Sequence, residues 1–502
     1  MKKIVLIFLS VLFFSLPSKA AGIDQSINDF LTPVANAVEG FFMTAVTIPW
    51  VGSAPFIVVW LVVAATFFTL YFKFINFRTF GIGIKLIRGK YDTTGAAGEV
   101  THFQALSTAV SGTVGLGNIA GVATAVSVGG PGATFWMILA GLLGMSSKFV
   151  ECTLGVKYRD VHPDGAVAGG PMRYLSKGFA EKGFPLFGKS LAVLFAILCV
   201  GAALGGGNMF QANQSFSQLQ NITGGAEGMM AGKGWIFGLA LAFITGLTIL
   251  GGIKSIARVT SKLVPIMGVI YVLTGLVVIA MNGDQLLSAI SQIINGAFSP
   301  SAALGGVIGV MVVGFQRAAF SNEAGIGSAA IAHSAVKTDR PITEGLVSLY
   351  EPFIDTVVVC TITALVIVIT GSLGTAEGLQ GIPLTSNAFA SAVSWFPYVL
   401  TVAAVLFAFS TMISWSYYGV RAWTYLFGEN KTQENVFKVI FLVFVVIGSS
   451  LDLSAVIGFS FSMTLAMAFP NIIGLYVMAP VVKEELQAFL ADIKSGKVVF
   501  AK

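Results

Sequence analysis

The segment Ser111-Gly112-Thr113-Val114-Gly115-Leu116-Gly117-Asn118 interrupts an otherwise apolar stretch of the chain. Glycine loosens a helix, and a polar group without a partner in hydrocarbon is energetically costly. Irregular backbone at membrane depth is therefore found where it is buried in protein or lines a polar cavity. Breaks of this kind hold the substrate and the coupling ion in secondary transporters. Close packing of small residues between two helices is the alternative interpretation of the same pattern.

The composition places this break in a membrane protein. Of the 502 residues, 55% are hydrophobic and only 10% are charged, whereas soluble domains carry about 25% charged residues. Several runs of roughly 20 apolar residues are each long enough to cross a bilayer. The three cysteines and three histidines show no metal-binding spacing, so we expect neither a disulfide framework nor a metal centre. No basic and aromatic cluster indicates nucleic acid.

The N-terminus has the pattern of a signal peptide over residues 1–20. Lys2 and Lys3 precede a short apolar core over residues 4–16, and Ser18-Lys19-Ala20 forms a small-x-small cleavage site. Cleavage after Ala20 would place the new N-terminus outside the cytoplasm. An uncleaved signal anchor is the alternative, and it would leave the topology downstream unchanged.

The mature chain is predicted to be an all-α polytopic protein with 11 transmembrane helices. Residues 21–101 would hold an amphipathic helix over 23–48, the first transmembrane helix and a cytoplasmic loop. Two sets of five helices follow over 102–282 and 303–480, and a cytoplasmic tail over 481–502. The spans are expected near residues 54–75, 103–126, 132–156, 189–210, 234–250, 263–281, 303–332, 350–371, 396–425, 436–449 and 454–480. Because five is odd, the second set starts on the opposite side of the membrane, as in an inverted repeat.

Charge gives the orientation of this topology. Nearly all lysines and arginines of the connections fall on alternate connections, and Lys233 is the exception. Basic residues favour the cytoplasmic side, which predicts an N-terminus outside and a C-terminus inside.

The first helix of the second set is interrupted as well. Its segment Gly314-Phe315-Gln316-Arg317-Ala318-Ala319-Phe320-Ser321-Asn322-Glu323-Ala324-Gly325-Ile326-Gly327-Ser328 mixes glycine with polar residues. Interruptions at corresponding positions of two halves are the best sequence indication of a transporter binding site.

The first break offers groups for both an anion and a cation. Backbone N–H groups near Gly115 and Gly117 would bind a carboxylate. The side-chain oxygen of Asn118 and the carbonyls near Ser111 and Val114 would ligate a hard cation. A packing hydrogen bond between helices is the alternative for Asn118.

Two later spans carry further polar groups. Ser410 and Thr411 offer paired hydroxyls that suit an alkali ion, although back-bonding to the i−4 carbonyl is the ordinary alternative. Trp415, one turn later, would line a pocket or lie at the interface. Asn208 and Gln211 are three residues apart, so an α-helix would place both on one face, toward the substrate or toward a neighbouring helix.

Ionisable residues inside spans need partners. Lys148 and Glu151 are expected to pair locally at i, i+3. Arg317 and Glu323 flank the second break and are expected to hold it or to form a cytoplasmic gate. Proton coupling through Glu323 or Asp355 stays open.

The motifs together resemble the sodium:alanine/glycine symporter family, over roughly residues 54–480. The residues that carry the resemblance are GLGNIAGV (115–122), GGPGATFWM (129–137), GMSSKFVECTLGVKYR (144–159), GGPM (169–172), GGNMFQAN (206–213) and SNEAGIGSAA (321–330). The resemblance implies a LeuT-like five-plus-five inverted repeat preceded by one extra helix.

The resemblance further implies sodium-driven uptake of small neutral amino acids, alanine and possibly glycine. Na⁺ would be the coupling ion, with no organic cofactor, in a bacterial inner-membrane protein that is a monomer or weak oligomer. The substrate would contact Gly115, Gly117, Asn118, Asn208, Gln211, Phe315 and Trp415. The sodium ion would contact Ser111, Val114, Ser410 and Thr411.

Rival classes remain. A channel would want repeated pore-lining rings, and the sequence has two inverted breaks instead. An enzyme would need a nucleophile and base or a metal motif on facing helices, and the sequence offers neither. A proton-coupled transporter of the same fold is the closer alternative.

Overall fold

The structure is a computed structural model that describes residues 43–498 except 49–51, 92–94, 164, 300–305, 376–378 and 380, together with residue 500 and scattered positions before residue 43. The signal peptide predicted over 1–20 and most of the helix predicted over 23–48 lie outside the described residues. At the end of the predicted helix, residues 45–48 instead form the strand β1 (Ala45–Ile48), which pairs antiparallel with β2 (Gly52–Pro55). Three consecutive β-branched residues, Val46, Thr47 and Ile48, favour extended backbone there.

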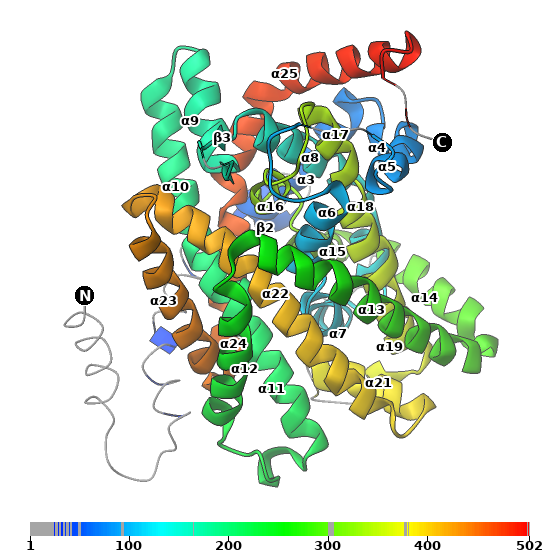
Figure 1. The fold of residues 1–502 in the computed structure, drawn as a ribbon. Coiled ribbons are helices and arrows are strands. Elements are labelled where there is room, and N and C mark those ends of the chain that lie inside the picture. The colour runs from blue at the N-terminus through cyan, green and yellow to red at the C-terminus, as the bar shows by residue number, and fades with distance from the viewer. Residues whose placement is uncertain are drawn as a thin grey trace.

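Helices make up most of the described chain (Figure 1). A second short hairpin joins β3 (Asp160–Val161) to β4 (Val167–Ala168). Up to residue 181 the helices are α3 (Phe56–Tyr71), α4 (Ile75–Arg78), α5 (Phe80–Ile87), α6 (His102–Thr113), the π-helical turn η1 (Gly117–Gly121), α7 (Val122–Gly129), α8 (Ala133–Lys157) and α9 (Pro171–Glu181). Then come α10 (Pro185–Leu204), the π-helical turn η2 (Gly205–Met209), α11 (Phe210–Ile222), the 3₁₀ turn η3 (Gly225–Glu227), α12 (Gly234–Ile249), α13 (Gly252–Met281), the 3₁₀ turn η4 (Gly283–Gln285) and α14 (Leu286–Phe298).

The second half of the chain is also mostly helical. It contains α15 (Val307–Asn322), α16 (Ala329–His333), α17 (Pro341–Ser348), α18 (Tyr350–Pro352), the π-helical segment η5 (Phe353–Cys360), α19 (Thr361–Ile369), α20 (Ser372–Thr375), α21 (Ile382–Ala392), α22 (Phe396–Phe427), α23 (Lys431–Ser450), α24 (Leu453–Ala466) and α25 (Ala468–Lys494).

Seven helical segments of the described chain are long and apolar enough to cross a membrane, and the bent pair of α6 and α7 brings the number to eight. The seven are 133–157, 185–222, 252–281, 341–369, 396–427, 431–450 and 453–494. Three shorter apolar helices, α3, α12 and α15, accompany them. The structure therefore confirms a polytopic helical architecture, while the count of eleven spans stays a prediction.

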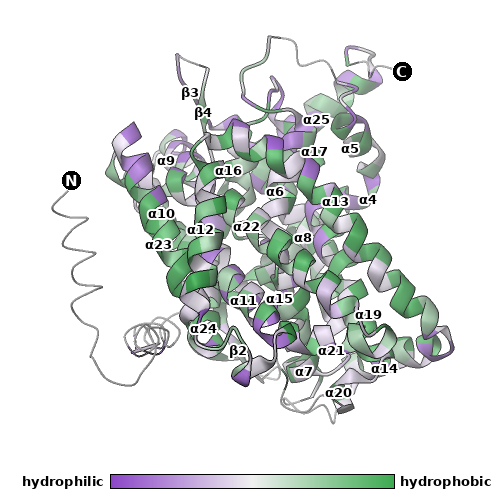
Figure 2. Cartoon of the chain, turned by 60° about the horizontal axis from the view of Figure 1, so that its bottom comes forward, coloured by the Kyte–Doolittle hydropathy of each residue, from purple (hydrophilic) through white to green (hydrophobic). Residues whose placement is uncertain are grey.

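The outer face of the bundle is apolar. On α13, the side chains of Ile266, Val269 and Leu273 are each more than half exposed, at 57%, 56% and 56%. Figure 2 shows the hydrophobic residues along the long helices and much of the hydrophilic ribbon toward the ends of the molecule. Exposed aliphatic side chains along whole helices are what a lipid-facing surface requires.

Both predicted breaks are present at the centre of this bundle. The axis bends by 49° between α6 and α7, across Val114–Leu116. α6 starts at a capping box made by Thr101 and Gln104, and it packs against α13 and α22 (Figure 1). The second break separates α15 from α16, and there Gly325 and Gly327 have positive φ angles of 88° and 94°. Glycine is needed at these two positions because a side chain disfavours that backbone conformation.

Several connections contain helices that the sequence analysis did not expect, among them α14 between the two halves and α21 before α22. α21 lies over the first break, where the Thr385 hydroxyl donates to the Ile119 carbonyl at 3.1 Å. A short helix without a long apolar period gives little signal in the sequence.

The contact between α23 and η2 depends on glycine. A Cβ added to Gly448 would lie 2.4 Å from the Met209 Cα, and backbone cannot move aside cheaply. We expect Gly448→Ala to lower the melting temperature of the detergent-solubilised protein, since overpacking costs about 1–3 kcal/mol. Gly268→Ala on α13, where a Cβ would meet nothing within 4 Å, is the control and should leave the melting temperature unchanged or higher. Equal melting temperatures for the two variants would contradict the close approach.

Candidate functional site

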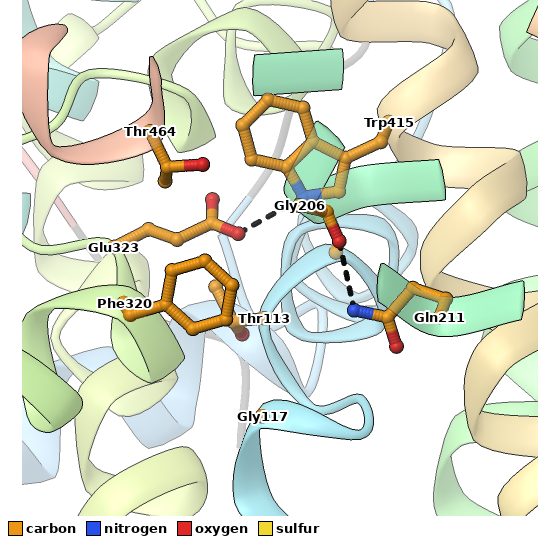
Figure 3. A pocket seen from close by; sticks show the side chains of 9 residues that line it. Thr113, Gly117, Gly206, Gln211, Phe320, Glu323, Trp415 and Thr464 are labelled. Carbon is orange, nitrogen blue, oxygen red and sulfur yellow. Dashed lines mark hydrogen bonds between the residues drawn. The ribbon is translucent and has the colours of Figure 1, made fainter. Parts of the chain in front are cut away.

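A cavity lies between the two helix breaks (Figure 3). About 260 Å³ of empty space lies among its lining atoms, part of it open to the surroundings, but the room for the centre of a water-sized sphere is only about 10 Å³. Its lining comes from α6, η1, η2, α11, α15, α22 and α24, and includes the residue that follows α15: Gly112, Thr113, Gly117, Gly206, Gln211, Phe320, Glu323, Trp415 and Thr464. Segments that are far apart in the sequence therefore meet at one polar site in the interior.

The first break satisfies part of its freed backbone with side chains. The Gly115 N–H donates to Asn118 Oδ1 at 2.8 Å, and the Leu116 N–H donates to Gln211 Oε1 at 3.0 Å. The N–H of Gly117, which lines the cavity, has no acceptor among the described residues. A buried N–H without an acceptor is rare, so Gly117 offers a donor to a ligand.

Asn118 also links the first break to the second half of the chain. Its Nδ2 donates to the Asp355 carboxylate at 2.6 Å and to the Asp355 carbonyl at 3.1 Å. Ser321, next to the second break, donates to the other Asp355 oxygen at 2.9 Å. Asp355 thus joins the two breaks through one buried carboxylate.

A cluster of oxygens lies where α6 meets α22. The Ser111 hydroxyl donates to the Ser410 carbonyl at 2.6 Å, and the Thr411 hydroxyl donates to the Ser111 carbonyl at 3.0 Å. The Ser410 hydroxyl itself donates back to Phe407 at 3.0 Å. Val114 follows the last residue of α6 and precedes Gly115, where a Cβ would lie 2.4 Å from the Thr411 hydroxyl. The structure thus brings the four residues predicted for sodium to one place.

The residues predicted to contact the substrate divide into two groups. Gly117, Gln211 and Trp415 line the cavity, and Gly115 and Asn118 form the backbone turn behind it. Asn208 instead donates to the Phe441 carbonyl at 2.6 Å, toward α23. Phe315 packs near Trp136, with ring centroids 6.4 Å apart.

Sequence reasoning predicted a substrate contact for none of six lining residues, although it considered Glu323 for the helix break, a gate or a proton. Gly112 and Thr113 belong to the segment already identified as the first break, Gly206 lies within the Gly205–Gly207 run, and Phe320 and Glu323 lie within the second break. Thr464 on α24 gave no comparable signal, because a single hydroxyl in an apolar helix usually bonds to its own backbone.

Phe320, which lines the cavity, belongs to an aromatic pair. The rings of Phe320 and Phe461 stack with centroids 3.8 Å apart, and the Arg317 guanidinium lies 4.2 Å from the centre of the Phe461 ring. Arg317 and Glu323 do not pair among the described residues, because Glu323 accepts from Trp415 and Ser328.

The expected local pair of Lys148 and Glu151 is wrong. Lys148 Nζ lies 2.8 Å from Glu351, across the interface with α18. Glu151 accepts from Asn471 on α25 at 2.9 Å. The i, i+3 spacing permitted the local pair, but each residue instead contacts a partner from a segment far away in the sequence.

With this geometry established, comparison with known proteins identifies the family. The model of the sodium:alanine symporter family matches residues 36–502. The chain belongs to this family. The sodium/alanine symporter AgcS of Methanococcus maripaludis is 41% identical over 438 residues, which cover 87% of this chain and 94% of AgcS. The amino-acid carrier protein AlsT of Bacillus subtilis is 32% identical, with 82% and 84% covered.

The solved structure of MhsT in complex with L-phenylalanine shares the fold. Its TM-score is 0.54 at 16% identity, and the match covers 79% of this chain and 99% of MhsT. A member of the sodium:alanine symporter family with several apolar helices is a multi-pass membrane protein. The relatives are transporters, which indicates a transporter and not an enzyme.

The first break should depend on Asn118. Asn118→Ala removes the acceptor for the Gly115 N–H and the donor to Asp355, and each buried group left unpaired costs about 1–3 kcal/mol. We expect a clear fall in the melting temperature of the detergent-solubilised protein. Asn282→Ala at the end of α13, which removes one bond to Val278, should cause a smaller fall. Equal falls would show that Asn118 does not support the break.

Proposed function

We propose that this protein is a sodium-coupled symporter that imports small neutral amino acids, alanine and possibly glycine, across a bacterial inner membrane by alternating access. The observation that carries the proposal is the cavity between the two helix breaks, with the oxygen cluster of Ser111, Ser410 and Thr411 beside it. Membership of the sodium:alanine symporter family and the likeness to AgcS support it.

The groups that line the cavity suit a small zwitterion. The free N–H of Gly117, at the start of η1, would donate to the substrate carboxylate. Trp415 and Phe320 occupy space on the other walls. A Cβ at Gly207 would lie 2.1 Å from the Trp415 ring, so the indole is packed directly against backbone. A large substrate side chain would have to displace these rings.

The sodium ion would bind at the oxygen cluster. Hydroxyl and carbonyl oxygens are the ligands that a hard monovalent cation accepts, and they require no unpaired charge inside the membrane. Val114 would contribute its carbonyl. Because the ligands come from both α6 and α22, a bound ion would favour the arrangement in which the first break approaches α22. Substrate bound at the same break would favour that arrangement too, and shared stabilisation of one state couples the two ligands.

Proton coupling is the second candidate. Asp355 favours it, because its buried carboxylate contacts Asn118 in the first break and Ser321 beside the second.

The proposed topology places the N-terminus outside and the C-terminus inside, as the distribution of basic residues among the connections favours. Two inverted five-helix sets would cover residues 102–282 and 303–480.

Transport by purified protein tests this function. We expect labelled L-alanine to accumulate in proteoliposomes under an inward Na⁺ gradient, and unlabelled glycine to inhibit it. A matched K⁺ gradient at clamped pH is the control and should give no accumulation. Accumulation driven by a proton gradient without Na⁺ would contradict sodium coupling and would favour Asp355.

The sodium ligands are tested by the joint change Ser410→Ala and Thr411→Ala. Loss of two oxygens should raise the Na⁺ concentration for half-maximal alanine uptake at least about tenfold, since a charge-assisted contact contributes about 1.5–3 kcal/mol. The matched control is Ser416→Ala with Thr424→Ala, also on α22, whose hydroxyls bond only to their own helix. Unchanged Na⁺ dependence in the first variant would remove both hydroxyl groups from the site.

A further inference from the structure

We propose that Glu323 is the residue that binds the α-ammonium group of the substrate. The inference rests on the proposed function and assigns one group of the cavity to one end of the amino acid. It gives Glu323 a role in selecting the substrate rather than in holding the helix break or carrying a proton.

The carboxylate is held at the cavity by an unusual backbone. Glu323 follows the last residue of α15 with a φ of 57°, in the left-handed region. A residue other than glycine pays about 1–2 kcal/mol for that conformation, and such residues concentrate at functional sites. The side chain accepts from Trp415 Nε1 at 3.0 Å and from the Ser328 hydroxyl, which fixes the carboxylate beside Thr464 and Phe320 (Figure 3).

Glu323 has hydrogen bonds but no cation of its own. Glu323 is only 3% exposed, and no ion pair in the described chain includes its carboxylate. Lys148 is already 2.8 Å from Glu351, and the Arg317 guanidinium lies over the Phe461 ring. A buried carboxylate without a counter-ion is costly, so a ligand that brings a positive charge would be stabilised here.

Two other features favour a cation at this end of the cavity. The C-terminal end of α15 adds partial negative charge beside Glu323. The Thr464 hydroxyl lines the cavity, is 2% exposed, and has no hydrogen-bond partner in the described structure. An ammonium group offers three N–H donors, of which Glu323 and Thr464 would accept two.

The two breaks then match the two ends of the substrate. The carboxylate would lie at the first break, near the N–H of Gly117, and the ammonium at the second break, near Glu323. A substrate that lacks the ammonium would leave Glu323 buried and unpaired. A binding site that pairs with a polar group of its substrate strongly rejects an analogue that lacks this group. An apolar pocket discriminates far less between substrates of different size.

Competition between alanine and lactate tests the inference, because lactate replaces the ammonium with a hydroxyl and keeps the carboxylate. Each unlabelled compound competes with labelled L-alanine uptake into proteoliposomes under a Na⁺ gradient, for wild type, Glu323→Gln and Glu151→Gln. Glu151→Gln is the matched control: it neutralises an equally buried carboxylate outside the cavity and keeps an acceptor for Asn471. The ratio of the two half-inhibitory concentrations does not depend on how much protein folds.

We expect wild type and Glu151→Gln to reject lactate. In Glu323→Gln, the half-inhibitory concentration of alanine should rise at least about tenfold. The half-inhibitory concentration of lactate divided by that of alanine should fall at least about tenfold. An unchanged ratio in an active Glu323→Gln variant would overturn the role of Glu323 and leave the proposed function intact. If Glu323→Gln is inactive, binding of alanine and lactate to the detergent-solubilised protein, read as a rise in melting temperature, gives the same ratio. Absence of alanine uptake by wild type would overturn both proposals.

Discussion

The structure depends on how backbone N–H and C=O groups find hydrogen-bond partners where two helices break inside an apolar bundle. Every freed N–H and C=O in such a place needs a partner, because no bulk water is present. At the first break, the side chains of Asn118 and Gln211 accept from Gly115 and Leu116. The donor that remains is the N–H of Gly117, a residue that lines the cavity. The first break therefore leaves one backbone donor available to a ligand.

The same requirement explains why buried polar residues gather around the breaks. A series of contacts between ionisable side chains joins α8, α18, α16, α17 and α6: Lys148, Glu351, His333, Glu344 and His102. All five side chains are nearly or fully buried. Buried charges of this kind are tolerated when paired, and here they hold together both broken helices and the helices that follow each of them.

Much of this was predictable from sequence because the signals are local. Glycine and polar residues inside apolar runs marked both breaks, and the contacts of Ser111, Ser410 and Thr411 bring the predicted sodium residues together. Other placements depended on the exact helical register. Asn208 lies within the π-helical turn η2 (Gly205–Met209), whose wider turn rotates it relative to Gln211. The expected α-helical spacing would place both residues on the same helix face. In the structure, Asn208 contacts α23, whereas Gln211 lines the cavity.

The sequence by itself determined the membrane class, the positions of the two breaks and the resemblance to the sodium:alanine symporters, because hydropathy, glycine content and motif order are properties of short segments. Only the tertiary structure decided which side chains share the cavity. Glu323 could pair with Arg317 by sequence, yet it accepts from Trp415, and Arg317 lies over Phe461. Partners of this kind come from segments far apart in the chain, and their distances are set by packing, which local patterns do not contain.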